Sequence, residues 1–196
     1  MGKFDGQVSS IDASGLMRRY VSGGAERPIE FVSHSLSHRC DAQRKSHNLA
    51  DMTIRVKGVI YSTERVEGCG PLHALDDAIR EALAKPFGEL CVRGVACVGY
   101  RGEGHFEDPD VPPGLHVDAE VTIGFIAAVD RETDQLVDLS ENGPAIEHVR
   151  WNSKATGKDI IDASMKALND GYNWFALNVL GDGQHITAAV NTAHTA

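Results

Sequence analysis

The 196-residue sequence predicts an α+β fold in which two similar halves, each a few strands followed by one helix, share one core. Two stretches carry this prediction, residues 66–83 and 152–171, because each has a glycine-bearing turn that leads into apolar residues at helical spacing. Strand-like stretches precede both. A shift of 89 residues aligns the two turns and indicates an internal duplication, pairing Gly68 with Gly157, Pro71 with Ile160, Ala74 with Ala163, Ala78 with Ala167 and Ile79 with Leu168.

Composition excludes several classes of protein. Lys and Arg number 19 against 28 Asp and Glu, and the resulting net charge of −9 disfavours a nucleic-acid or anionic membrane partner. The sequence has no apolar run of the roughly 20 residues that a membrane span needs, and its first residues lack the apolar segment of a signal peptide. We therefore expect a soluble, cytoplasmic protein.

The four cysteines do not suggest a metal centre. Cys40, Cys69, Cys91 and Cys97 form no C-x-x-C pair, which argues against a zinc ribbon or a thioredoxin-type site. His34 and His38 with Cys40 match no established ligand spacing. We predict reduced thiols, no metal and no cofactor, with Cys69 as the one thiol placed to be reactive, because it lies beside a helix N-terminus.

The first half begins after a polar segment. Residues 1–28 are expected to be an N-terminal arm or linker with one short helix at 14–20. β-Branched and alternating residues predict strands at 29–36 and within 52–63, the second stretch forming two strands or a bulged hairpin around Gly58. The polar, locally basic residues 37–48 between them are predicted to form an exposed loop, which in an acidic chain is able to attract an anionic ligand or partner.

The first glycine turn is the most informative stretch of this half. Gly68 and Gly70 free the backbone, and Pro71 suits the first turn of the helix that follows. The first-turn N–H groups of such a helix lack partners and can accept a carboxylate or phosphate. The alternative is a tight turn that binds nothing. The helix is expected to end near Pro86-Phe87-Gly88.

The second half is predicted from the same kinds of pattern. Trp174 and Phe175 are expected to be packing or interface anchors rather than ligand stackers. Residues 179–196 are small and polar and are expected to form a loose tail. The expected order is a strand at 90–100, a loop at 101–114, a long strand at 116–129, a loop at 130–144, a strand at 145–151, and then the second turn and helix at 152–171.

Two motifs together resemble a known family. The sequence G-C-G-P-L-H-A-L at residues 68–75 and the sequence D-I-I-D-A-S-M-K-A-L at residues 159–168 are similar to the two helix starts in the C-terminal regulatory, or dimerisation, domain of 2-isopropylmalate and citramalate synthases. The resemblance spans residues 29–178. It implies two βββα units related by a pseudo-twofold axis, with antiparallel or mixed sheets and helices on one face. It also implies pairing of two subunits and feedback binding of leucine or isoleucine.

The sequence departs from the family in several places. The family approaches its second helix through a segment resembling W-G-x-x-G-x-S, whereas this chain has W-N-S-K-A-T-G-K at residues 151–158. Lys154 and Lys158 suit a more anionic ligand than an amino acid, or are solvated surface charges. The loops at 102–114 and 130–144 are enlarged. The synthase chemistry belongs to a barrel of about 250 residues, longer than this chain, so we assign no synthase activity here.

Three classes of function follow from these observations. The first is a non-catalytic, small-molecule-binding homodimer, acting in feedback on a synthase of leucine biosynthesis or free-standing, where it senses or sequesters an anionic metabolite or nucleotide. The second is a purely structural dimerisation module. The third is an enzyme that uses Cys69 as nucleophile and His73 as base, for which the sequence shows no third, orienting group. For the first class the predicted ligand-binding residues are Gly68, Cys69, Gly70, Pro71, Gly157, Lys158, Asp159 and Ser164.

Overall fold

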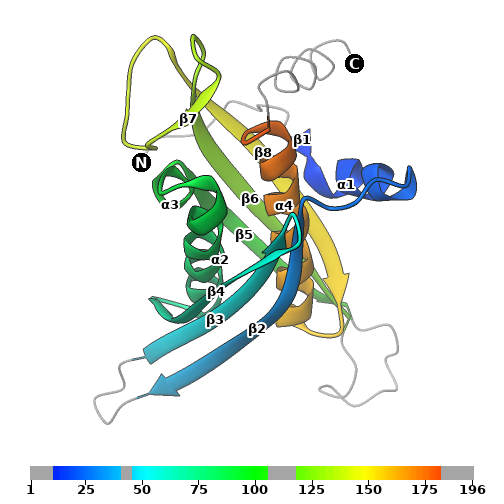
Figure 1. The fold of residues 1–196 in the computed structure, drawn as a ribbon. Coiled ribbons are helices and arrows are strands. Elements are labelled where there is room, and N and C mark those ends of the chain that lie inside the picture. Colours follow the sequence, from blue (N-terminus) through cyan, green and yellow to red (C-terminus); the bar gives the residue numbers. More distant parts are fainter. Residues whose placement is uncertain (1–10, 41–45, 106–117, 182–196) are drawn as a thin grey trace, which may run out of the picture.

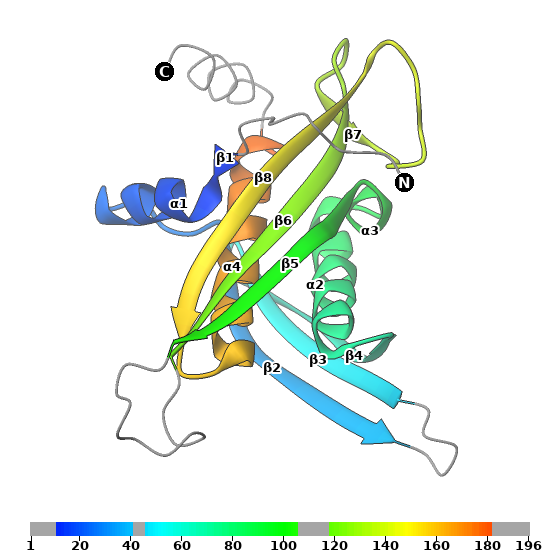
Figure 2. The same ribbon diagram turned by 180° about the vertical axis from the view of Figure 1, so that it is seen from behind.

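A computed structural model of the chain describes residues 11–40, 46–105 and 118–181. Its two sheets enclose the two long helices α2 (Pro71–Phe87) and α4 (Ile160–Asn178), which lie side by side between them (Figure 1, Figure 2). Helix α2 packs on one sheet and α4 on the other. The predicted α+β class is confirmed.

The smaller sheet is antiparallel and has the order β2-β3-β4. Its strands are β2 (Ile29–Cys40), β3 (Ser46–Val56) and β4 (Val59–Gly68). The predicted hairpin around Gly58 is confirmed: Lys57 and Gly58 both have positive φ, 50° and 81°, as a two-residue type I′ turn requires. The prediction of an exposed loop at 37–48 is wrong at both ends of that range, because β2 and β3 continue to pair there. Residues 41–45 lie outside the described part.

The larger sheet has the order β1-β8-β6-β5, with β7 (Gln135–Val137) also paired to β6. The other strands are β1 (Ile11–Asp12), β5 (Val95–His105), β6 (Asp118–Asp130) and β8 (Ile146–Gly157). The long strand predicted at 116–129 is confirmed from Asp118 onward as β6, and its first two residues lie outside the described part.

Three expectations for this half are wrong. Residues 90–93 form the short helix α3 (Leu90–Arg93), which buries Cys91, and β5 starts only at Val95. The loop expected from residue 101 begins later, because β5 continues to His105, and residues 106–117 are not described. Most of the turn expected at 152–157 belongs to β8, which pairs with β6 from Ile146 to Gly157.

The predicted arm is in part packed. The short helix expected there is α1 (Ala13–Ser22), whose residue Met17 is buried against the core. The hydroxyls of Ser14 and Ser153 lie 2.8 Å apart, which fixes α1 to β8. The first ten residues of the arm, and residues 182–196 of the expected tail, lie outside the described part of the chain.

Helix α4 supplies a large part of the core. Its Trp174 and Phe175 are buried, which confirms a packing role for both. Phe125 of β6 stacks on Trp151 of β8 at 5.3 Å between ring centroids, and Trp174 lies 4.8 Å from Trp151 on the same measure. Within the described residues, no helix is both long and apolar enough to cross a membrane.

The helices α2 and α4 begin with the same close contact. A Cβ at Gly68 would lie 2.3 Å from the backbone nitrogen of Ala74, and a Cβ at Gly157 would lie 2.4 Å from that of Ala163. Each glycine ends a strand, and each alanine lies in the first turn of the next helix. Only glycine allows this approach, so Gly68 and Gly157 are structural residues.

This contact predicts a specific loss of stability. Gly68→Ala and Gly157→Ala should each lower the free energy of unfolding by about 2 kcal/mol, because the added methyl overlaps helix backbone that cannot move away cheaply. Urea unfolding measures the change. Gly99→Ala is the matched control, since a Cβ there meets nothing within 4 Å. Equal stability of all three variants would contradict the prediction.

Candidate functional site

A groove of about 400 Å³ lies between the start of α2 and strand β5. Strand β5 is an edge strand, and its register shifts between Cys97 and Gly99, where it bulges. Val98 and Tyr100 beside the bulge are about half exposed. The residues that line the groove are Leu72, His73 and Asp76 of α2 and Cys97, Val98, Gly99 and Tyr100 of β5.

The carboxylate of Asp76 lies at one side of this groove and is only 3% exposed. Its Oδ1 accepts hydrogen bonds from the hydroxyl of Tyr172 and from the thiol of Cys97, the latter at 2.9 Å. Burial, reinforced by the negative charge of Asp76, raises the pKa of Cys97 and of Tyr172 well above their usual values. Both groups therefore stay protonated and act as donors.

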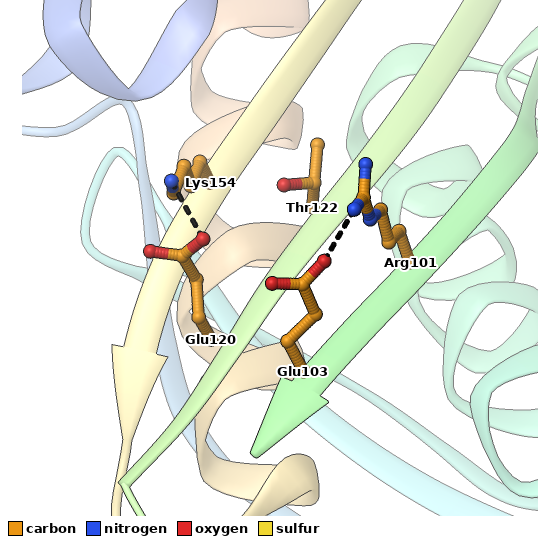
Figure 3. Close-up of a pocket in the computed structure, with 5 residues that line it drawn as sticks. All are labelled: Arg101, Glu103, Glu120, Thr122 and Lys154. Atoms are coloured by element: carbon orange, nitrogen blue, oxygen red, sulfur yellow. Dashed lines mark ion pairs between the residues drawn. The ribbon is translucent and has the colours of Figure 1, made fainter. Parts of the chain in front are cut away.

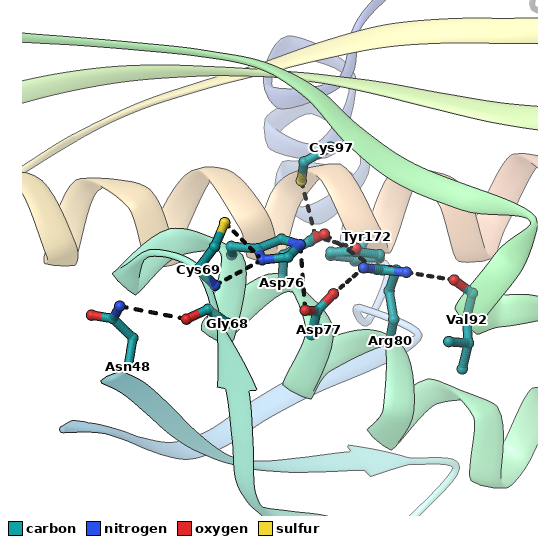
Figure 4. Close-up of polar contacts among 10 residues, drawn as sticks. Asn48, Gly68, Cys69, Asp76, Asp77, Arg80, Val92, Cys97 and Tyr172 are labelled. Carbon is teal, nitrogen blue, oxygen red and sulfur yellow. Dashed lines mark hydrogen bonds and ion pairs between the residues drawn. The ribbon is translucent and has the colours of Figure 1, made fainter. Parts of the chain in front are cut away.

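Arg80 neutralises Asp76 and ties α2 to α3. Its Nε lies 3.2 Å from Asp76 Oδ2, and the same guanidinium pairs with Asp77 and donates to the carbonyl of Val92 (Figure 4). A buried carboxylate needs such a partner, since an unpaired one would cost several kcal/mol. The carboxylates beside the groove are thus already occupied by protein donors.

The starts of α2 and α4 differ at the residue that precedes the helix. Helix α4 is capped by its own Asp159, whose Oδ1 accepts from the backbone N–H of Ile161 at 2.8 Å and of Asp162 at 2.9 Å. Helix α2 starts after Gly70, which has no side chain to make such a bond. The first-turn N–H groups of Leu72 and His73 are therefore available, and both residues line the groove.

Besides the glycine contact, the starts of α2 and α4 share a hydrogen bond from the residue before the cap. In each helix the third residue accepts a hydrogen bond from the residue before the cap: Cys69 N–H donates to His73 Nδ1 at 3.2 Å, and Lys158 N–H donates to Asp162 Oδ2 at 3.0 Å. The same shift along the chain that aligns the two glycine turns also aligns these pairs. The structure also brings together Cys69 and His73, the nucleophile and base of the third hypothesis, with Sγ 3.3 Å from Nδ1.

None of the eight predicted ligand-binding residues lines the groove, although three lie at its border. Cys69 contacts His73, Pro71 precedes Leu72, and the Ser164 hydroxyl is 3.4 Å from that of Tyr100. The others have different roles: Gly68 and Gly157 pack against helices, Gly70 and Asp159 are helix caps, and Lys158 is exposed.

Lys154 lies away from the groove, on the exposed face of the larger sheet. There it pairs with Glu120 at 2.6 Å, and the neighbouring Arg101 pairs with Glu103 at 2.5 Å, around a shallow hollow that Thr122 also lines (Figure 3). Each of these two cations has its own carboxylate, so the hollow itself presents no surplus positive charge for an anionic ligand.

Comparisons with known proteins leave the site to be interpreted from its geometry. No protein-family model matches the chain, and no curated protein matches it. In the described ranges, no three His, Cys, Asp or Glu side chains are placed to hold a metal ion.

The hydrogen bond from Tyr172 to the buried Asp76 predicts that Tyr172 makes a pH-dependent contribution to the free energy of unfolding. Tyr172→Phe should lower the free energy of unfolding at pH 7 by about 1–3 kcal/mol, because a buried carboxylate loses a donor. The phenol ionises near its usual pKa of 10.0 in the unfolded chain but well above it in the folded one. Its stabilising contribution is therefore complete below pH 10 and is lost as pH rises further.

Urea unfolding at pH 7 and at several values above pH 10 measures both effects. The wild type should lose more stability than Tyr172→Phe over the alkaline range. If the free energy of unfolding falls equally with pH in the wild type and in Tyr172→Phe, the phenol is not held protonated in the folded protein. Tyr20→Phe, at an exposed tyrosine on α1, is the matched control.

Proposed function

We propose that this protein is a non-catalytic module that binds a small molecule in the groove between α2 and β5. The observation that carries the proposal is the uncapped start of α2 beside an apolar hollow. The groove of about 400 Å³ falls within the range of small-molecule sites, roughly 300–1,000 Å³. The ligand has one anionic group and an apolar body.

The chemistry of the lining supports this type of ligand. The N–H groups of Leu72 and His73, at the positive end of the helix dipole, suit a carboxylate or phosphate. Leu72, Val98 and the ring of Tyr100 offer apolar surface for the remainder. Leucine and isoleucine match this description in their carboxylate and side chain, in agreement with the family resemblance, and an anionic metabolite or nucleotide matches it in its anionic group.

A structural dimerisation module is the second candidate. The packing of Gly68 and Gly157 gives these glycines a role without any ligand, and the exposed edge strand β5 offers Val98 and Tyr100 for pairing. We propose a homodimer in either case. Sedimentation equilibrium tests it, with a monomer at micromolar concentration as the contradicting result.

Isothermal titration calorimetry distinguishes the two candidates. Leucine, isoleucine and a panel of nucleotides beginning with AMP are titrated into the protein, and native mass spectrometry is used to find any co-purified small molecule. We expect one ligand per chain. No heat from any compound, together with no co-purified molecule, would favour the structural module.

Two substitutions test whether the ligand binds in the groove. Gly99→Leu fills open space beside the bulge, and Gly70→Asp gives α2 the cap that Asp159 gives α4; neither position has an atom within 4 Å of an added Cβ. Both variants should remain folded and lose at least tenfold in affinity. Gly143→Ala, in a distant turn, is the control. Unchanged affinity in both variants would exclude the groove.

A further inference from the structure

Cys69, His73 and Asp77 form a continuous chain of contacts at the start of α2. The Sγ of Cys69 lies 3.3 Å from Nδ1 of His73, and Nε2 of the same imidazole lies 3.4 Å from Oδ2 of Asp77. His73 and Asp77 are one helical turn apart on α2, and Cys69 lies just before the helix, next to its cap residue Gly70. Asp77 is the orienting group that the third hypothesis lacked.

The hydrogen bonds fix the direction in which a proton can move. Nδ1 of His73 accepts the backbone N–H of Cys69 at 3.2 Å, so in the neutral ring the proton is on Nε2, facing Asp77. The single lone pair of Nδ1 faces both this backbone N–H and the thiol of Cys69, whose Sγ lies 3.3 Å away, so Nδ1 takes the thiol proton in exchange for the backbone hydrogen bond. A thiol, a base and a carboxylate in this order are the parts of an activated nucleophile.

Asp77 is itself held in place. It pairs with Arg80, whose guanidinium also contacts Asp76 and the carbonyl of Val92. The imidazole is thus positioned on one side by a backbone N–H and on the other by an anchored carboxylate. His73 is exposed, so a substrate can reach the imidazole.

Cys69 differs from the other thiols whose surroundings the structure describes. It is exposed, whereas Cys91 is buried and Cys97 donates to Asp76. Cys69 also precedes a helix whose N-terminus has no side-chain cap. The groove provides a second, independent feature, because His73 lines it and an apolar chain fits beside Val98 and Tyr100.

We propose that Cys69 is a nucleophilic thiol that takes an acyl group from a thioester, with His73 as the base and Asp77 as a positioning residue. The inference rests on the proposed function only in that the acyl chain lies in the same groove. A carbonyl electrophile is favoured over an alkylating one, because the open N–H groups of Leu72 and His73 suit the oxyanion that forms during acyl transfer.

The step is balanced and needs no oxidant. The thiol proton passes to His73 Nδ1 as Sγ attacks the carbonyl carbon, and the bond from that carbon to the leaving sulfur then breaks. His73 returns the proton to the leaving thiolate. The products are one S-acylated Cys69 and one free thiol, with one acyl group per chain.

The test uses the full chain in a Cys40→Ser background, which leaves Cys69, Cys91 and Cys97. The probe is the butanoyl thioester of N-acetylcysteamine, and intact and peptide mass spectrometry follow the adduct. We expect one adduct, on Cys69, and none on Cys69→Ser. His73→Ala should slow it by a factor on the order of 100, the size of a general-base contribution.

Asp77→Asn distinguishes positioning from simple packing. It should lower the maximal rate of acylation and leave the thioester concentration for half-maximal rate unchanged, since the imidazole loses the carboxylate that positions it while the groove stays intact. His34→Ala, at an exposed histidine of β2, is the control and should leave the rate unchanged. Circular dichroism confirms that each variant is folded.

Equal rates in wild type and His73→Ala, or an adduct confined to Cys91 or Cys97, would overturn the proposal. This failure is distinguishable from failure of the proposed function. If calorimetry shows binding of leucine or AMP but no acylation occurs, only the proposal of a nucleophilic Cys69 is wrong. If acylation occurs without such binding, only the proposal of a reversibly bound ligand is wrong.

Discussion

The contact between a strand-ending glycine and the first turn of the next helix determines the geometry of both halves. Because Gly68 and Gly157 have no Cβ, the backbones of Ala74 and Ala163 can approach them closely. Each helix then starts at a fixed distance from its own sheet, and the third residue of the helix bonds back to the residue before the cap. The two helices differ at the cap itself. Asp159 closes the start of α4, and Gly70 leaves the start of α2 open.

The buried carboxylate of Asp76 connects the two halves beside the open start of α2. Asp76 and Arg80 belong to α2, Tyr172 belongs to α4, and Cys97 belongs to β5. A buried, paired carboxylate contributes little net stability but permits few alternative arrangements of its partners. We therefore expect the cluster to hold β5 at a fixed distance from α2. The groove depends on that spacing.

Local features of the fold could be predicted from the sequence, and long-range ones could not. The hairpin at Gly58, the start of α2 and the strand β6 follow from turn chemistry and periodicity within a short window. The extension of β8 comes from its pairing with β6, which no local pattern reports. The groove could not be predicted for the same reason, because Asp76, Cys97 and Tyr172 are far apart in the sequence. Asp77 had a signal, since it continues the four-residue spacing of Cys69 and His73.

The open start of α2, and not the capped start of α4, is where we expect the ligand to bind. The most direct measurement is the titration of ¹⁵N-labelled protein with leucine, and separately with AMP, followed by amide chemical shifts. We predict saturable shifts at Leu72, His73 and Gly99 with at least one of the two compounds, and unchanged shifts at Ile161 and Asp162. Shifts centred on Ile161 and Asp162, or no saturable shift with either compound, would contradict this placement of the ligand.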